Sequence, residues 1–281
     1  MVNYIKISDF KEIMPPRSQY SNKGTFGRVL NIAGCEKYRG AALLSSVSPL
    51  KTGAGLVTLA ADENIIPSIC APEITFLPLK GHKDSVELLE AVQSYDVISI
   101  GCGLGTDKEA QKLIETVFGI ETNAKWVIDA DALNIISELN IEKLPQNSIL
   151  TPHPKEMSRL LKVDAEKINT NREEYAVYCA KKFNSVVLLK GHNTVVTDGQ
   201  RIYINRTGNS ALAKAGSGDV LTGIISGLTA QGLSPFEAGI KGAYLHGLAG
   251  ELASKDMSEY SVLASDIIEY LPKVILNISN R

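Results

Sequence analysis

The fold is decided by residues 208–232, GNSALAKAGSGDVLTGIISGLTAQG. The first half of this stretch is small and flexible. In the second half, apolar residues recur with the spacing of one helical face. They are Val220, Leu221, Ile224, Ile225 and Leu228. The stretch therefore predicts a loop that leads into a buried helix.

A candidate anion site lies where this loop meets the helix, at residues 215–219, AGSGD. Glycines let the backbone approach a ligand closely, and the first N–H groups of a helix have no partner inside it. The macrodipole adds roughly half a positive charge there, which suits a phosphate. Asp219 is then either a first-turn carboxylate present for local reasons or a general base. The motif alone leaves both interpretations open.

Short apolar runs elsewhere predict a mostly parallel β-sheet. Six buried strands are expected, at residues 28–33, 56–61, 97–100, 126–128, 149–150 and 186–189. Helical patterns lie between them, for example at residues 87–94, 108–117 and 171–183. Strands that alternate with helices predict an α/β fold with helices on both faces of the sheet.

The remaining segments complete one predicted domain over residues 1–281, with residues 1–27 as an irregular leading arm. A helix from Gly40 to about residue 53 should be kinked or shortened by Pro49. A hairpin is expected at residues 194–205, because Asp198-Gly199 is a favoured turn. Two further helices are expected, one from a Ser234 cap to about residue 253 and one at residues 265–278.

Polar or glycine-rich clusters follow four of the predicted strands. They lie at residues 101–105, 129–134, 151–156 and 190–194. Open α/β sheets bind their ligands at the carboxyl ends of the strands. The clusters therefore predict one ligand site at that edge of the sheet.

Several side chains in these clusters have two interpretations. Asp129 and Asp131 either bind a metal ion or ligand hydroxyls, or they start the next helix. His153, between two prolines, indicates a helix start. Glu156 either caps that helix or contacts a magnesium-bound phosphate. Lys190 either binds a phosphate or a purine, or is a surface lysine with a packed stem.

Composition and charge exclude several classes of protein. The net charge is 29 − 31 = −2 with scattered basic residues, so we expect no nucleic-acid partner. The four cysteines are far apart and form no metal-binding pair. No segment is apolar enough for an export signal or a membrane anchor. We therefore expect a reduced, cytoplasmic protein.

The motifs together resemble one family, the NAD(P)H-hydrate dehydratases, which are ribokinase-like proteins that use ADP or ATP to repair hydrated nicotinamide cofactors. The motifs that carry this resemblance are GSGDVLTG at 216–223, GLTAQG at 227–232, DADALN at 129–134, TPHPKE at 151–156, IGCGLG at 100–105 and KGHNT at 190–194. The departures from the family pattern are Cys102 in place of proline, Ala211-Leu212 in place of Gly-Met, and Ala215 in place of glycine.

The resemblance implies a three-layer α/β/α fold and a set of site residues. It supports the interpretation of Asp219 as the catalytic base, and the contact of Glu156 with a magnesium-bound phosphate remains one of the two interpretations above. For the hydrated dinucleotide it implies Ala41, Gly103, Gly105, Asp129, His153 and Asp219. For the nucleotide it implies Lys190, Gly191, His192, Asn193, Thr194, Gly216, Ser217 and Gly218. It also implies Mg²⁺, ADP or ATP as co-substrate, a homotetramer, and no fused epimerase domain. The alternative is a small-molecule kinase similar to hydroxyethylthiazole kinase.

Overall fold

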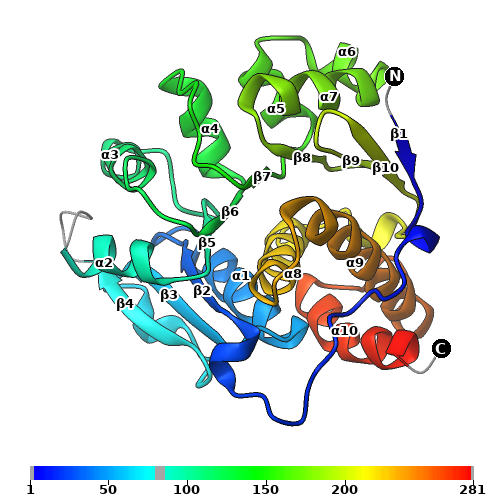
Figure 1. Cartoon of the computed structure of the whole chain (residues 1–281), viewed down its shortest axis with the longest axis horizontal. Helices are drawn as coiled ribbons and strands as arrows, with labels where there is room; N and C mark the ends of the chain where they lie inside the picture. The colour runs from blue at the N-terminus through cyan, green and yellow to red at the C-terminus, as the bar shows by residue number, and fades with distance from the viewer. Residues whose placement is uncertain (1–2, 80–85, 280–281) are drawn as a thin grey trace.

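A computed structural model describes residues 3–79 and 86–279, which build one layered α/β structure (Figure 1). The strands are β1 Asn3–Ile5, β2 Arg28–Ile32, β3 Leu56–Asp62, β4 Thr75–Leu79, β5 Val97–Ile100, β6 Lys125–Ile128, β7 Ser148–Leu150, β8 Val186–Leu189, β9 Thr194–Thr197 and β10 Arg201–Asn205. They form one sheet in the order β1-β10-β9-β8-β7-β6-β5-β2-β3-β4. Among these strands, β9 alone runs antiparallel to its neighbours, as the predicted hairpin requires.

Helices cover both faces of this sheet. They are α1 Arg39–Thr52, α2 Val86–Ser94, α3 Lys108–Phe118, α4 Asp131–Glu138, α5 Pro154–Leu161, α6 Ala165–Thr170, α7 Arg172–Phe183, α8 Ser217–Ala230, α9 Pro235–Met257 and α10 Ala264–Ser279. In Figure 1, α1, α8, α9 and α10 lie on one side of the sheet, and α3 to α7 lie on the other. This arrangement confirms the three-layer α/β/α fold.

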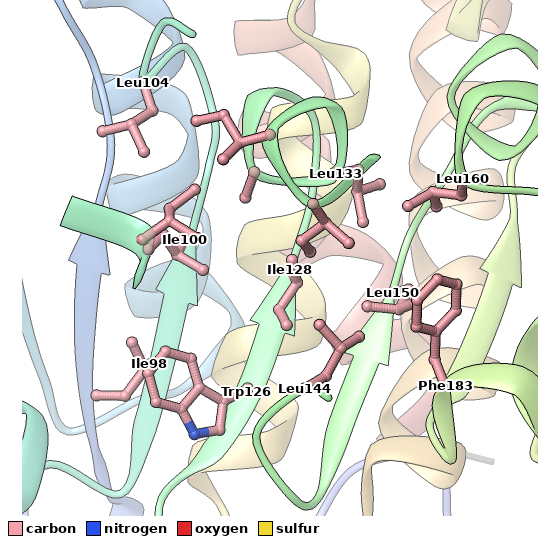
Figure 2. Close-up of a cluster of buried hydrophobic side chains, with 14 of the residues drawn as sticks. Ile98, Ile100, Leu104, Trp126, Ile128, Leu133, Leu144, Leu150, Leu160 and Phe183 are labelled. Carbon is pink, nitrogen blue, oxygen red and sulfur yellow. The ribbon is translucent and has the colours of Figure 1, made fainter. Parts of the chain in front are cut away.

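Each face of the sheet carries its own hydrophobic core, because strands covered on both sides are apolar on both sides. Along β5, Ile98 and Ile100 face α3 and α4, while Val97 faces α8. Figure 2 shows the first of these cores, where side chains of β5, β6 and β7 pack under Leu133, Leu160 and Phe183. A third, smaller cluster includes Ala42 of α1 and Leu59 of β3. The parallel pairing of β5 to β8 puts their carboxyl ends along one edge of the sheet.

Helix α8 is the buried helix predicted from residues 208–232, and it packs closely on α1. A Cβ added to Gly223 would lie 2.6 Å from Cβ of Ser48, and one added to Gly227 would lie 2.8 Å from the carbonyl oxygen of Pro49. Real Cβ atoms do not approach so closely, so these two glycines let the helix backbones touch. Pro49 does not end α1, which continues to Thr52.

The sequence reasoning missed two edge strands. β1 lies within the predicted irregular arm and pairs in parallel with β10. β4 pairs with β3 and contains Pro78, which is tolerated on an edge strand. The six buried strands and the hairpin were predicted to within one or two residues at each end. In the parts of the chain that the structure describes, no helix has the length and apolarity to cross a bilayer.

Candidate active site

The candidate site lies at the carboxyl ends of β6 and β8, where α4, α5 and α8 begin. At its centre, Lys190 Nζ lies 2.6 Å from Asp129 Oδ1. Thr222 Oγ1 of α8 donates to Asp129 Oδ2 at 2.6 Å. Residues from three distant segments therefore share one buried hydrogen-bonded group.

The charges of Lys190 and Asp129 stabilise each other. Burial alone would raise the pKa of Asp129, but the ammonium of Lys190 and its hydrogen bond hold that pKa below its usual value. Burial alone would lower the pKa of Lys190, and the carboxylates of Asp129 and Glu156 raise it instead. Both groups are therefore ionised at neutral pH. Lys190 is not the surface lysine that was one of its two interpretations.

The first N–H groups of α5 are capped by side chains of the helix start itself. His153 is the N-cap, and its Nδ1 accepts hydrogen bonds from the backbone N–H groups of Lys155 and Glu156 at 3.1 and 3.2 Å. Glu156 Oε2 accepts from the backbone N–H of His153 at 2.7 Å, and Pro154 fills the first helical position. This is a capping box with histidine in the place of serine. The predicted helix start and the capping interaction of Glu156 are confirmed.

Glu156 also faces the buried centre of the site. Its Oε2 lies 3.8 Å from Lys190 Nζ. Burial raises the pKa of Glu156 to about 7, against the opposing effect of Lys190. Among the described residues, no three histidine, cysteine or acidic side chains gather as metal ligands. The carboxylate of Glu156 is therefore committed to the cap, and its contact with magnesium stays a prediction.

The start of α8 is open by contrast. Gly216 is its N-cap, with a positive φ of 89°, and no described side chain caps the helix. A Cβ at Gly216 would lie 2.6 Å from Leu44 Cδ1, so a larger residue does not fit there. A Cβ added to Gly218 would lie 3.5 Å from Lys190 Nζ. The N–H of Ser217 donates to the carbonyl oxygen of Lys214 at 3.3 Å, while those of Gly218 and Asp219 have no partner inside the helix. Free N–H groups and a buried ammonium are thus close together, which is the chemistry of an anion site.

Asp219 lies in the first turn of α8 beside this anion site. Burial raises the pKa of Asp219 to about 6, and the nearby charge of Asp129 raises it further, while a hydrogen bond from Cys102 lowers it. The Cys102 thiol is buried and also lies 4.0 Å from Asp129 Oδ2. A half-buried carboxylate with a pKa near 6 is suited to accept a proton at neutral pH.

Asp129 and Asp131 do not act as a pair. β6 ends at Ile128, and Ala130 takes a positive φ of 49°, so the strand does not continue through the two aspartates. Asp131 begins α4 and accepts the backbone N–H of Gly105 at 2.9 Å. The two aspartates therefore have different partners, and a shared metal ion does not fit this geometry.

The β5–α3 loop approaches the start of α1. Gly103 has a positive φ of 60°, and a Cβ there would lie 2.6 Å from Tyr38 Cβ and 2.8 Å from Ala41 Cβ. Gly103 and Ala41 therefore lie against each other, with no room for a side chain at position 103. The binding of a ligand by Ala41, Gly103 and Gly105 stays a prediction.

The 190–194 loop borders a cavity of about 770 Å³. Gly191, His192 and Asn193 line it, together with Arg172 and Arg206. Gly191 has a positive φ of 136°, and Thr194 Oγ1 donates to its carbonyl oxygen at 2.9 Å. Arg172 donates through Nη2 to the carbonyl oxygens of Leu189 and Lys190 at 2.9 and 3.1 Å. The loop is therefore held in one conformation beside the cavity.

Sequence reasoning missed four side chains of this region. They are Cys102, Arg172, Thr222 and His246. Cys102 stood out only as a departure from the family pattern, and Thr222 only as part of a motif. Their partners lie between 17 and 93 positions away, and no local pattern reports contacts over such distances.

Comparison with known proteins supplies independent information about the chain. Residues 29–273 match the family model described as NAD(P)H-hydrate dehydratase. The chain is 40% identical to the bifunctional NAD(P)H-hydrate repair enzyme Nnr of Moorella thermoacetica, over 95% of this chain and 53% of that protein. It is 35% identical to the ADP-dependent (S)-NAD(P)H-hydrate dehydratase of Bacillus subtilis, over 93% of each. The chain thus spans about half the length of the bifunctional relatives and nearly all of the shorter one.

A solved structure agrees with these matches. The ADP/ATP-dependent NAD(P)H-hydrate dehydratase of Bacillus subtilis, co-crystallised with ATP and Mg²⁺, superposes with a TM-score of 0.83 at 33% identity and covers 94% of both chains. The ribokinase-like fold implied by the motifs is confirmed. With 245 matched positions (273 − 29 + 1) in the family model, the chain belongs to the NAD(P)H-hydrate dehydratase family.

Proposed function

We propose that this chain dehydrates the S-epimer of hydrated NADH or NADPH, at the expense of ADP or ATP, and so restores NAD(P)H. The observation that carries the proposal is Asp219 beside the open start of α8, where a carboxylate with a raised pKa adjoins an anion site. Family membership and the names of its relatives support the same reaction.

Asp219 is the proposed general base. It takes the proton from the C6 hydroxyl of the hydrated ring as that oxygen attacks the terminal phosphorus of the nucleotide. The bridging P–O bond breaks at the same time and releases AMP from ADP, or ADP from ATP. General bases of this kind contribute roughly 10²–10⁴ in rate. The C6–O bond of the phosphate ester then breaks, driven by the lone pair of the ring nitrogen, and phosphate leaves. Loss of a proton from C5 to the departing phosphate restores the double bond of the dihydronicotinamide.

The start of α8 is the proposed cradle for the transferred phosphoryl group. N–H groups of Gly216, Gly218 and Asp219 are fixed dipoles at the place where negative charge develops. The N–H of Ser217 joins them only by leaving the carbonyl oxygen of Lys214, 3.3 Å away. Lys190 adds a positive charge near Gly218, and Asp129 keeps that ammonium in place. The cradle therefore needs little rearrangement during the reaction.

The two substrates enter from opposite sides of Lys190. We place the nucleotide on Lys190 to Thr194 and on residues 216–218, with its base and sugar toward the 770 Å³ cavity that this loop borders. We place the hydrated dinucleotide on the side where small residues gather. That side is formed by Ala41, Gly103, Gly105, Asp129 and His153, with Asp219 at the junction.

Magnesium fits this site through the nucleotide. The described side chains form no metal cluster, and Glu156 is engaged by His153, so the phosphate oxygens would supply most of the ligands. When bound, Mg²⁺ neutralises phosphate charge. Lys190 orients the phosphate from the protein side, and we propose that Glu156 meets Mg²⁺ only through that phosphate.

One assay tests the proposed function. Purified protein is mixed with Mg²⁺, ADP or ATP, and the hydrated S-epimer of NADH, and the return of the dihydronicotinamide absorbance is followed. Recovery supports the dehydratase. Nucleotide consumption only with another alcohol would identify a small-molecule kinase instead, and the absence of either reaction would identify a nucleotide-binding sensor. Parallel runs with ADP and ATP decide the phosphoryl donor, for which we propose ADP.

We further propose a single ribokinase-like domain that works as a homotetramer in the cytoplasm. The support is the family resemblance and the single sheet that the described strands form. Size-exclusion chromatography with light scattering tests the tetramer, because it measures the mass of the assembly directly.

A further inference from the structure

A buried polar contact joins the first residue of α8 to the middle of α9. Ser217 Oγ lies 3.1 Å from His246 Nε2. The two residues are only 4% and 6% exposed. The reaction proposed above uses the backbone of Ser217 but gives His246 no task. A histidine sealed behind an anion site and in contact with its first residue calls for a physical explanation.

Helix α9 holds the whole segment that leads into α8. Asn205 Nδ2 donates to the carbonyl oxygen of Ala243 at 3.1 Å. Further along, the backbone N–H of Gly208 donates to Glu251 Oε1 at 2.7 Å, and Asn209 Nδ2 donates to Ser254 Oγ at 2.8 Å. The contact between His246 and Ser217 is the last of this series along the chain, and it reaches the helix start itself.

The imidazole of His246 is neutral. Burial lowers the pKa of His246 to about 4, and the positive charge of Lys190 acts in the same direction. A neutral imidazole carries a hydrogen on one nitrogen only. A hydrogen bond with the Ser217 backbone opposes the lowering of the pKa. We assign the ring hydrogen to Nε2, the nitrogen that lies 3.1 Å from Ser217 Oγ.

This assignment determines where the hydroxyl proton of Ser217 points. If Nε2–H donates to Ser217 Oγ, the serine hydroxyl cannot use its own hydrogen toward the ring. That hydrogen then remains free for an acceptor outside the helix. The acceptor in reach of the first residue of α8 is an anion at the open helix start, next to the N–H groups of residues 216–219.

We propose that His246 is a positioning residue for nucleotide binding, which donates to Ser217 Oγ and thereby directs the Ser217 hydroxyl at the phosphate held by α8. The inference rests on the proposed function, since it takes the anion to be a nucleotide phosphate. It adds one side-chain donor to the cradle of backbone N–H groups. It also gives His246 a task that a purely structural contact between two helices does not have.

Calorimetric titration with ADP and Mg²⁺, and separately with adenosine, tests the inference. Hydrogen bonds to charged groups are worth about 1.5–3 kcal/mol, so S217A should weaken ADP binding roughly 10-fold or more. H246L should weaken it by a similar factor, and S217A/H246L by no more than either single change. Adenosine, which has no phosphate, should bind all variants equally. H246Q, whose amide N–H replaces Nε2–H, should bind ADP within about threefold of the wild type.

A matched control and the opposing outcomes complete the design. S254A removes another polar contact of α9, the one with Asn209, and should leave the affinity for ADP unchanged. If H246L binds ADP as tightly as the wild type, the inference about His246 is wrong, while the proposed function stands. The same conclusion follows if the variants lose affinity for ADP and for adenosine equally. A wild-type protein that binds no ADP would overturn the proposed function together with the inference. If H246L does not fold, H246Q and S217A still decide the outcome.

Discussion

Two of the helices that begin at the candidate site, α5 and α8, differ in how their first turns are capped. Helices α5 and α8 both carry an acid at the third helical position, Glu156 in one and Asp219 in the other. Glu156 reaches back to the backbone N–H of His153 and closes its helix. Asp219 has a side chain one methylene shorter and follows a glycine N-cap without a capping side chain. Two acids in the same helical position therefore have different tasks.

The difference teaches how a helix start becomes a reactive site. A capped start such as that of α5 has its donors satisfied, so it fixes structure. An uncapped start such as that of α8 keeps its donors for a ligand, and its acid is left to accept a proton. Burial raises the pKa of both acids, to about 7 for Glu156 and about 6 for Asp219, so burial alone does not separate their tasks.

The largest expected effect is on catalysis at α8. D219N should lower kcat by about 10²–10⁴ while ADP still binds, because the general base is lost and the backbone donors remain. Steady-state rates of dehydration and titration with ADP check both parts. A variant that keeps more than about a tenth of the wild-type kcat, with nucleotide binding intact, would show that Asp219 is not the base.

The thermal stability of D219N shows whether its loss of activity is due to unfolding. The folded-state pKa of Asp219 is raised from 3.8 to about 6, so the protein loses stability as the pH rises through this window. At pH 7 the ionised carboxylate therefore costs about 2–3 kcal/mol. D219N removes this cost and should melt at a higher temperature than the wild type at pH 7. Loss of activity by simple unfolding would give the opposite shift.

The second effect concerns Lys190, which contacts Glu156 of α5 and lies near Gly218 of α8. K190M should destabilise the fold by about 3–5 kcal/mol, because it leaves Asp129 buried without its counter-ion. Denaturant unfolding measures the change. K190M/D129L, which removes both charges, should recover most of the stability, and a double variant as unstable as K190M would contradict the ion-pair explanation.

The third effect distinguishes the capping hydrogen bond of Glu156 in α5 from the negative charge of its carboxylate. E156A should lower the unfolding free energy by about 0.5–2 kcal/mol, the usual cost of losing a cap. E156Q keeps an oxygen that accepts the His153 N–H. Because the folded-state pKa of Glu156 is raised from 4.5 to about 7, the wild type should lose stability relative to E156Q as the pH rises through this range. Melting curves at several pH values between these limits check the sign.

The smallest expected effect is a shift in the pH dependence of kcat/KM, which depends on the pKa of Asp219 in α8. The Cys102 thiol donates a hydrogen bond that lowers the pKa of Asp219. C102A should therefore raise that pKa and move the acidic limb of kcat/KM to higher pH, by less than about one unit. C102S keeps a donor and should shift the limb less. An unchanged limb in C102A would show that the thiol does not contact the base.

The fold followed from the sequence wherever local patterns were strong. The apolar runs at β2, β5 and β8 and the helical face of α8 predicted the sheet and its buried helix. β1 and β4 escaped because they are short edge strands, one polar and one containing Pro78. Their pairing depends on neighbours far along the chain rather than on their own residues.

The site was predictable in its location but not in its internal contacts. Because ligands bind at the carboxyl ends of strands in open α/β sheets, the sequence predicted that Asp129, His153 and Lys190 lie together. The same rule did not distinguish a metal pair from two unrelated aspartates, because that depends on the positive φ of Ala130. It also gave no sign of His246, which lies on a helix of small residues and meets Ser217 across 29 positions.

The close contacts at Gly223 and Gly227 between α1 and α8 limit how the substrate specificity of this protein can be engineered. Because Gly223 and Gly227 let the two backbones touch, Ala41 at one end of α1 and Asp219 at the start of α8 belong to one rigid piece. That wall of the site cannot widen unless the two helices separate. Libraries aimed at larger substrates should therefore vary the 101–105 and 190–194 loops, which border the site without carrying this contact.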